Sequence, residues 1–429
     1  MVLLAAGPQE PRISVLLVGI AVVLLAGLVL GRAVVWLRQP VVIGEIAAGI
    51  ALGPSLLGRL PGGLPDLLFP EDVRPILSGI AQVGLVLFMF ALGWEFERRL
   101  IRPYAALAAG VSLASIALPF GLGMAAAVLL HPHYATVAGK YVPFVPFAVF
   151  MGVAMSATAF PVMARILADR GLQGTRVGVL ALASAAIDDV LAWFLLAFVS
   201  ILVVSEGGYP GLVRTGGLSL LYVVLMLLVV RPLLERLVRW GVGTDRWSVL
   251  VTALIAGAFI SSWLTSWIGI HAIFGAFLFG FVMPREHAEP IVRRLRAPVE
   301  DIGLVFLPVF FVVTGLNVDL SALVPGDYLA LALLLVVACV GKMVGAFVPA
   351  RLSGFTRREA ADLALLMNTR GLTELIILNV GVGLGVLDGR IFTLLVVVAL
   401  VTSAMTGPLL SRKPASPTGH VVDLVGSRT

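Results

Sequence analysis

The sequence contains few charged residues and only one cysteine. Charged residues make up 13% of the 429 residues and hydrophobic residues 60%, whereas an average soluble chain has about 25% charged residues. Apolar runs of about twenty residues, long enough to span a bilayer, recur along the chain. Cys339 lies in one of these runs and excludes an intrachain disulfide. The sequence therefore predicts an all-α integral membrane protein.

The formal charge of +6 does not indicate a nucleic-acid-binding protein. Basic residues occur as short clusters between apolar runs and do not form a continuous face, which is typical of membrane topology signals. We therefore expect a lipid bilayer around the chain and no nucleic-acid partner.

Thirteen apolar segments are separated by charged residues, proline or glycine. They fall at 13–36, 39–58, 75–95, 103–130, 143–168, 175–204, 212–238, 247–267, 269–284, 298–318, 328–350, 360–386 and 391–411. The ninth is short for a span. The first run lacks a preceding basic segment and continues to Trp36, so we interpret it as a span and not as a cleaved signal peptide. We expect a transmembrane domain over 1–411 and a short disordered cytoplasmic tail over 412–429.

The distribution of basic residues predicts the orientation. Of the 30 Lys and Arg residues, 22 fall in loops on one side of the predicted spans, six fall on the other side, and Lys342 and Arg370 fall within spans. Cytoplasmic loops are enriched in Lys and Arg. This bias predicts the N-terminus outside and the C-terminus inside, with the chain in the plasma (cytoplasmic) membrane.

Six ionisable residues lie not at the ends of the predicted spans but in their interior, where each charge is costly and commonly marks an ion or proton pathway. They are Glu45, Asp188, Asp189, Lys342, Arg370 and Glu374. Four acids and two bases leave acidic charge over even if both bases are paired. A bound cation or protons must balance the remainder.

Two of these acids are adjacent in "ASAAIDDVLAWF" (183–194), in the middle of an apolar run. Neighbours on a helix project about 100° apart, so one carboxylate can face a partner helix while the other faces a cavity. Close carboxylates resist simultaneous ionisation, so the pair can hold protons at one pH and a small cation at another. The alternative is a polar clamp between helices, which needs only one carboxylate.

Lys342 is one of three lysines in the chain and lies at mid-span in "VVACVGKMVGAF". A desolvated lysine can lose its proton, whereas arginine stays charged. We therefore expect Lys342 to pair with one aspartate and release its proton when a cation displaces it. Snorkelling to an interface is the alternative, although Arg351 is ~13 Å away along a helix.

Two spans carry helix-breaking patterns. In "GVAMSATAFPVMARIL", Pro161 removes a backbone donor, and Ser156 and Thr158 lie in the preceding turn. In "LLMNTRGLTELIILNVG" a polar patch interrupts the run, made of Asn368, Thr369, Arg370, Gly371, Thr373 and Glu374. Non-helical backbone at membrane depth must be buried in protein or line a cavity. An ordinary proline kink and a helix-clamping polar patch are the alternatives.

The two patterns fall at corresponding positions. Six spans before and six after a linking seventh place spans 4–6 opposite spans 11–13, so each half carries a broken helix in the middle of its last three spans. Corresponding spans of the two halves are seven spans apart, and because seven is odd, the two halves have opposite orientations in the membrane. Paired interruptions of this kind indicate a transporter's binding site near the membrane midplane.

Five stretches together resemble the monovalent cation:proton antiporter-2 family of bacterial Na⁺ or K⁺/H⁺ exchangers. They are "QPVVIGEIAAGIALGPSLLG" (39–58), "SATAFPVMARIL" (156–167), "ASAAIDDVLAW" (183–193), "GIHAIFGAFLFG" (269–280) and "MNTRGLTELIILNVG" (367–381). The resemblance implies the sodium/proton antiporter fold: a panel domain, a core domain with two crossed, unwound helices, and a homodimer.

By that resemblance Asp189 is the main cation and proton ligand and Asp188 pairs with Lys342, with Thr158, Ser156 and unwound carbonyls near them. Arg370 and Glu374 compensate the helix ends that meet there. Glu45 lies in a family motif without an assigned transport role. His271 either tunes the pH response or makes a structural hydrogen bond.

The predicted function is Na⁺/H⁺ antiport by alternating access, without an enzymatic step or cofactor. Within the family an Asp-Asp pair implies electrogenic exchange. Three alternatives remain: a K⁺/H⁺ exchanger or K⁺ efflux system, an ion-coupled organic anion symporter, and an intramembrane aspartyl protease. The symporter needs uncompensated midplane bases, and the protease needs its aspartates on different helices. K⁺-efflux relatives usually carry a Gln-Asp pair, which this chain lacks.

Overall fold

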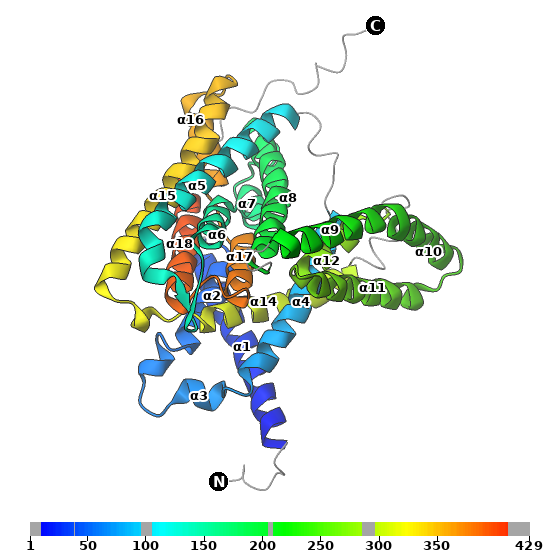
Figure 1. Ribbon diagram of the computed structural model, residues 1–429, viewed down its shortest axis with the longest axis horizontal. Helices are drawn as coiled ribbons and strands as arrows, with labels where there is room; N and C mark the ends of the chain where they lie inside the picture. Colours follow the sequence, from blue (N-terminus) through cyan, green and yellow to red (C-terminus); the bar gives the residue numbers. More distant parts are fainter. Residues whose placement is uncertain (1–9, 38, 96–104, 205–208, 285–296, 411–429) are drawn as a thin grey trace.

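The computed structural model describes residues 10–37, 39–95, 105–204, 209–284 and 297–410, and they form an almost entirely helical molecule (Figure 1). In chain order the elements are α1 (Glu10–Trp36), α2 (Val41–Leu52), η1 (Leu57–Arg59), α3 (Leu64–Leu68), α4 (Arg74–Glu95), α5 (Ala105–Tyr134), β1 (Thr136–Val137), β2 (Lys140–Tyr141), α6 (Phe144–Ser156), α7 (Phe160–Asp169), α8 (Arg176–Val204), α9 (Tyr209–Leu225), the π-helical turn η3 (Met226–Val230), α10 (Arg231–Gly243), α11 (Trp247–Ile268), α12 (Ala272–Phe281), α14 (Ala297–Leu316), η5 (Leu320–Ala322), α15 (Pro325–Leu352), α16 (Arg357–Met367), α17 (Leu372–Gly383) and α18 (Gly389–Leu409).

Within these residues, twelve helical segments are long and apolar enough to cross a membrane. The predicted ninth span, 269–284, is the shorter apolar helix α12. It follows α11 after a turn at Gly269, whose φ of 104° favours glycine. The predicted tail, 412–429, and many of the loop arginines used for the orientation, including those at 285–296, lie outside the described residues.

The helices pack as two bodies. The panel consists of α1, α2, α4, α11, α12 and α14, and the core consists of α5 to α8 and α15 to α18. The helices α9 and α10 project from the rest together with α11 (Figure 1). The core contains the sequence of a long helix, a broken helix and another long helix twice, as α5 to α8 and as α15 to α18.

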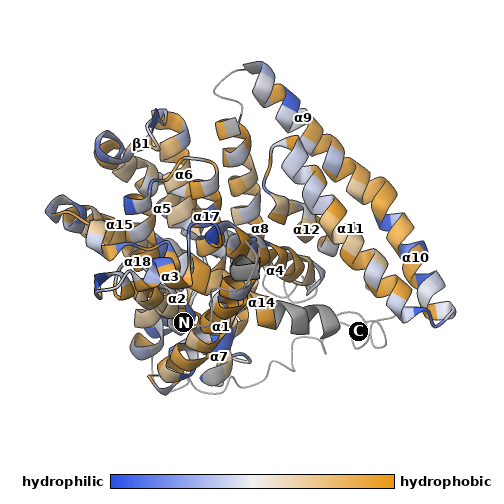
Figure 2. Ribbon diagram, turned by 90° about the horizontal axis from the view of Figure 1, so that it is seen from below, coloured by the Kyte–Doolittle hydropathy of each residue, from blue (hydrophilic) through white to orange (hydrophobic). Residues whose placement is uncertain are grey.

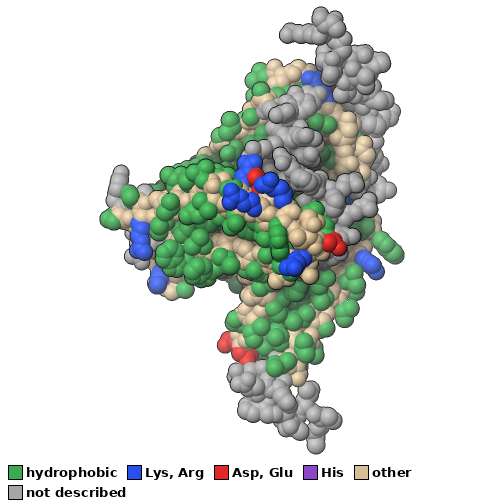
Figure 3. Space-filling model, turned by 90° about the vertical axis from the view of Figure 1, so that its right-hand side faces the viewer, with side chains coloured by type: hydrophobic (Ala, Val, Ile, Leu, Met, Phe, Trp, Pro, Cys, Tyr) green, Lys and Arg blue, Asp and Glu red, His purple; other side chains and the backbone are tan. Residues whose placement is uncertain are grey.

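The outside of the molecule is apolar where lipid is expected. Hydrophobic residues are prominent on the projecting helices α9 and α11, and α10 mixes hydrophobic with basic residues (Figure 2). The face in Figure 3 is mostly hydrophobic, with basic residues gathered in small groups. The large side chains of Leu228 in η3 and Trp263 in α11 are more than 60% exposed. In water such a surface would aggregate, so it indicates a lipid-facing surface.

Candidate functional site

Two broken helices meet in the middle of the core. The first is interrupted at residues 157–159, between α6 and α7, and the second at residues 368–371, between α16 and α17. The backbone N–H of Ala159 donates to the carbonyl of Thr369 at 3.0 Å, which joins the two interruptions. A Cβ on Gly371 would lie 2.8 Å from Cγ2 of Val162, so glycine allows this close approach. Each predicted break is present in the structure.

The local sequence explains the first break. Pro161 occupies the first turn of α7, where its missing N–H is not needed and its fixed φ suits a helix start. The same ring would clash within a continuous helix, so α6 ends at Ser156 before it. The hydroxyl of Thr158, between the two half-helices, can then point at the partners described next.

Asp188 is held by donors on both of its oxygens. Oδ1 accepts from Ser112 at 2.5 Å, and Oδ2 accepts from Thr158 at 2.7 Å and from Ser115 at 3.3 Å. Lys342 lies 3.1 Å from Oδ2 and completes a buried ion pair. A carboxylate accepts about four hydrogen bonds, so Asp188 has little capacity left for another ligand.

The ammonium of Lys342 is shared. Nζ donates to Thr158 Oγ1 at 2.5 Å as well as to Asp188, and its side chain is 0% exposed. The structure thus places Lys342 with Asp188 and Thr158 and not at a membrane interface. Burying two charges is costly unless both are paired and hydrogen-bonded, a condition that this arrangement meets.

Asp189 has a different set of partners. Thr373 in the first turn of α17 donates to Oδ1 at 3.0 Å, and the backbone N–H of Phe160 at the start of α7 also donates to this carboxylate. The carboxylate therefore lies at the N-termini of two half-helices, where the partial positive charge stabilises an anion. It is nearly as buried as Asp188, at 5% exposed, but it has fewer hydrogen-bond partners. Asp189 keeps acceptor capacity for a cation or a proton.

Arg370 lies at the carbonyl end of the half-helix α6. Its guanidinium donates to the carbonyls of Ala154 at 2.9 Å and Met155 at 2.5 Å, in the last turn of α6, and to Glu374 at 2.7 Å. Both side chains of the Arg370–Glu374 pair are 0% exposed. A positive charge at the C-terminus of α6 and a negative charge in the first turn of α17 each compensate the partial charge of the helix end beside them.

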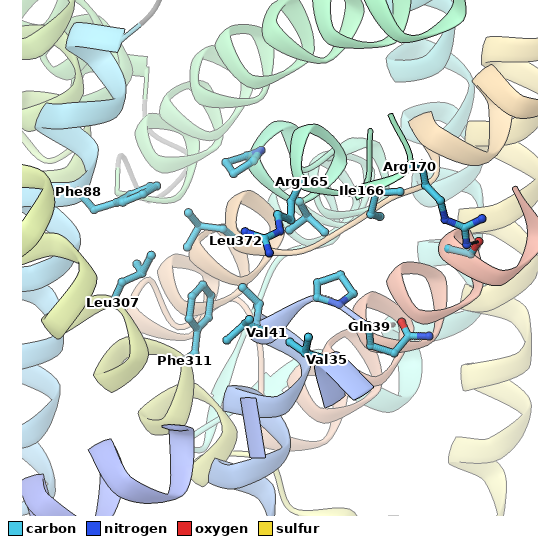
Figure 4. Close-up of a pocket in the computed structure, with 15 residues that line it drawn as sticks. Val35, Gln39, Val41, Phe88, Arg165, Ile166, Arg170, Leu307, Phe311 and Leu372 are labelled. Atoms are coloured by element: carbon cyan, nitrogen blue, oxygen red, sulfur yellow. Dashed lines mark hydrogen bonds between the residues drawn. The ribbon is translucent and has the colours of Figure 1, made fainter. Parts of the chain in front are cut away.

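A cavity of about 580 Å³ approaches this crossing from one side (Figure 4). Pro161 and Leu372 line it, and each is one residue from a partner of Asp189, namely Phe160 and Thr373. Arg165 points into the cavity in Figure 4, and Arg170 lines it while donating to the carbonyl of Gly407. The cavity extends from the crossing toward the turn between α7 and α8.

Three predicted polar residues of the breaks lie beside the aspartates without contacting them. Ser156 donates to the Val153 carbonyl of its own helix at 2.9 Å. The Asn368 amide lies 3.8 Å from the sulfur atoms of Cys339 and Met405, and the Thr369 hydroxyl donates to that of Thr406 at 3.3 Å.

Two further predicted residues lie in the panel. Glu45 of α2 is 8% exposed, and its Cγ would lie within 4 Å of Cβ atoms added to Gly27 or Gly31 of α1. His271 caps the start of α12, where Nδ1 faces the backbone N–H of Ile273 at 3.5 Å. Neither residue contacts the aspartate pair.

Sequence reasoning missed Ser112 and Ser115 as partners of Asp188. They lie three residues apart in an otherwise apolar run, "GVSLASIAL", and this spacing places them on one helix face. Two small polar residues on one face of a span were the sequence feature that could have indicated a partner for a buried carboxylate.

Comparisons with known proteins identify relatives of this chain. Residues 13–412 match the family described as "Sodium/hydrogen exchanger, transmembrane". The chain is 39% identical to the Na⁺/H⁺ antiporter NhaS4 of Synechocystis sp., over 89% of this chain and 92% of that relative. It is 36% identical to K⁺/H⁺ antiporter 1 of Saccharomyces cerevisiae, over 87% of this chain and 43% of that relative. The chain also spans less than half of several plant relatives.

A solved structure shares the fold. The sodium proton antiporter MjNhaP1 from Methanocaldococcus jannaschii matches with a TM-score of 0.66 over 93% of this chain and 99% of that chain, at 15% sequence identity. The all-α architecture expected from the sequence is therefore confirmed.

Proposed function

The chain belongs to the sodium/hydrogen exchanger family, and from this premise we propose that it is a secondary active antiporter that exchanges a monovalent cation, Na⁺, for protons. One observation carries the proposal. Two adjacent buried carboxylates have unequal partners: Asp188 accepts from Ser112, Ser115, Thr158 and Lys342, whereas Asp189 accepts from Thr373 and the Phe160 backbone. Asp189 is the one with room for an exchangeable ligand.

Protons and the cation compete for Asp189 in this mechanism. An ionised carboxylate between two helix N-termini attracts either ligand, and neither a metal cofactor nor ATP is required because the proton gradient supplies the energy. The nearby hydroxyls of Thr373 and Thr158 and the carbonyls of the two interruptions supply oxygen ligands for a partly dehydrated cation. Transport in this form includes no catalytic step.

Lys342 provides the second proton. When a cation binds Asp189, its charge weakens the attraction that holds Lys342 protonated beside Asp188, and a desolvated lysine can release its proton. Exchange of more than one proton per cation is electrogenic. The lysine would be protonated again when the cation leaves.

Alternating access follows from movement of the core against the panel. The cavity with Arg165 and Arg170 is then the access route on the arginine-rich side, which we assign to the cytoplasm, with the N-terminus outside. The cytoplasmic membrane as location and a homodimer as assembly belong to the same proposal.

Proton flux in proteoliposomes tests the proposal. With a pH dye inside and a proton gradient imposed, Na⁺, Li⁺ or K⁺ is added to wild-type protein, to Asp189→Asn and to the control Asp66→Asn, whose side chain is 79% exposed. We expect Na⁺ to change the internal pH with wild type and the control and to have no effect with Asp189→Asn. An equal response from Asp189→Asn contradicts the proposed site.

A K⁺/H⁺ exchanger is the second candidate, because one relative carries that name. The same series separates the two: a response to K⁺ that exceeds the response to Na⁺ assigns K⁺ as the substrate. No response to any monovalent cation favours the symporter alternative.

A further inference from the structure

Trp193 lies one turn beyond Asp189 on α8. Residues four apart on a helix share a face, and four residues advance about 6 Å along the axis. The side chain is 3% exposed. Its ring faces two residues of the panel helix α12: the centroid distances are 6.4 Å to Phe274, with the rings nearly perpendicular, and 6.2 Å to Phe277. Trp193 therefore connects the core to the panel beside the cation site.

The cavity and Trp193 lie on opposite sides of Asp189. The half-helix α7 begins at Phe160, next to Asp189, and its ten residues lead toward the start of α8 at Arg176. The cavity follows that half-helix through Arg165, Ile166 and Arg170. Trp193 lies further along α8 in the other direction.

Beyond Asp189 the inward face of α8 is closed. Ala192, Trp193, Leu196 and Val199 are at most 3% exposed, so water-filled space does not continue along this face. An apolar constriction excludes ions because it cannot replace their hydration shell. We propose that Trp193, packed against Phe274 and Phe277, is the seal that closes the cation site on the side away from the cavity. This assignment rests on the proposed antiport function.

The indole N–H gives the seal a property that a phenyl ring would lack. Its nitrogen is buried and has no hydrogen-bond partner in the part of the chain that the structure describes. An unsatisfied buried donor destabilises the state that contains it. The closed contact thus stays weak enough to separate when the core moves, and a transporter must have two states of similar free energy.

Access of an ion-sized thiol reagent tests the seal. Thr373→Cys, in a Cys339→Ser background, places a thiol beside Asp189; Asp189→Cys is a second reporter if the first does not fold. Ag⁺ is added to one side of the membrane, and the thiol that remains free is counted with a fluorescent maleimide after denaturation. The reaction rate is measured from each side with Trp193, Trp193→Phe, Trp193→Ala, and the control Phe194→Ala, whose side chain is 65% exposed on the same helix.

We expect Trp193→Ala to raise the rate from the side away from the cavity at least tenfold and to leave the cavity-side rate unchanged. Phe194→Ala should keep both rates of the Trp193 protein. Trp193→Phe, whose ring packs without the unpaired donor, should give a rate from the side away from the cavity that is no higher than that of the Trp193 protein. Proteoliposomes with Trp193→Ala on the otherwise unmodified chain should also lose a proton gradient without added cation, because both sides are open at once.

Three results contradict the seal or the packing that forms it. An unchanged rate in Trp193→Ala means that other residues close this side. A rise that is matched by a fall on the cavity side means that residue 193 sets the balance of two orientations and does not seal either. A two-sided reaction with Trp193→Phe would also contradict the packing argument. These rates report access and not exchange, so they stand apart from the cation-response test of the antiport function.

Discussion

Lys342 and Asp188 form an ion pair that is buried on all sides, with Nζ 3.1 Å from Oδ2 and the two side chains 0% and 1% exposed. The pair joins α8, the last long helix of the first half of the core, to α15, the first long helix of the second half. Desolvation of both charges opposes the pair, and the hydroxyls of Ser112 and Thr158 offset that cost by completing the hydrogen bonds of the carboxylate. We therefore expect the stability of the protein to depend on the same two residues to which the proposed mechanism assigns a role in transport.

Removing one partner should destabilise the protein more than removing both. Lys342→Met leaves a buried carboxylate unpaired, at a cost of about 3–5 kcal/mol, whereas Lys342→Met combined with Asp188→Asn leaves no charge. We expect the single variant to have a markedly lower Tm in detergent and the double variant to recover most of the loss. A double variant as unstable as the single one would show that the charge pair does not cause the loss.

Lys342→Arg tests the second proton. Arginine keeps the positive charge beside Asp188 but does not release a proton in proteins. We expect exchange to continue with one proton fewer per cation, so that the membrane potential no longer drives it. Measuring the reversal of flux against imposed gradients of pH and potential gives the ratio. An unchanged ratio means that the second proton resides elsewhere.

Thr373→Val removes the side-chain donor to Asp189 while keeping the shape of the residue. The carboxylate loses one hydrogen bond, and the cation loses a neighbouring oxygen. A hydrogen bond of this kind contributes about 1–2 kcal/mol. We therefore expect the cation concentration for half-maximal exchange to rise about five- to thirtyfold. Thr252→Val on α11, whose hydroxyl is exposed and bonds its own helix, is the matched control and should leave that concentration unaltered.

Competition at Asp189 predicts the sign of the pH dependence. Acidification protonates the carboxylate and removes the cation's main ligand, so the half-maximal cation concentration should rise by up to about tenfold per pH unit while one proton competes. Alkaline pH should lower it to a plateau. The measurement is the cation response at a series of equal internal and external pH values. A half-maximal concentration that is independent of pH would exclude a shared site.

Much of the fold could be predicted from the sequence because hydropathy alone encodes the spans. The limits of α8, Arg176–Val204, agree with the predicted 175–204, and Pro161 and the polar patch near Arg370 marked the two breaks. The short helix α12 did not fit a simple span because it begins after the turn at Gly269 and packs against α4 and α11. Hydropathy carries no information about that packing.

The partners of the site residues were harder to predict than the residues. Ser112 and Asp188 are 76 positions apart, so their contact depends on how α5 packs against α8. The pairing of Arg370 with Glu374 follows from their spacing of four, but the bonds from Arg370 to α6 cross 215 and 216 positions. Single-sequence patterns report local periodicity and do not report such contacts.

Because of these bonds between distant parts of the chain, we expect the replacement of Arg370 by lysine to destabilise the protein. The guanidinium bonds the carbonyls of Ala154 and Met155 and the carboxylate of Glu374 together, and one ammonium cannot reproduce that fork. Arg370→Lys leaves buried acceptors unpaired, each worth about 1–3 kcal/mol, so we expect a Tm lower by several degrees.

Arg351→Lys is the control, because Arg351 is exposed at the end of α15 and donates to the carbonyl of Phe355. Arg351 makes one such bond, which the ammonium of a lysine can also make, whereas the guanidinium of Arg370 serves three acceptors together. Equal Tm values for the two lysine variants would therefore mean that Arg370 does not hold the crossing together.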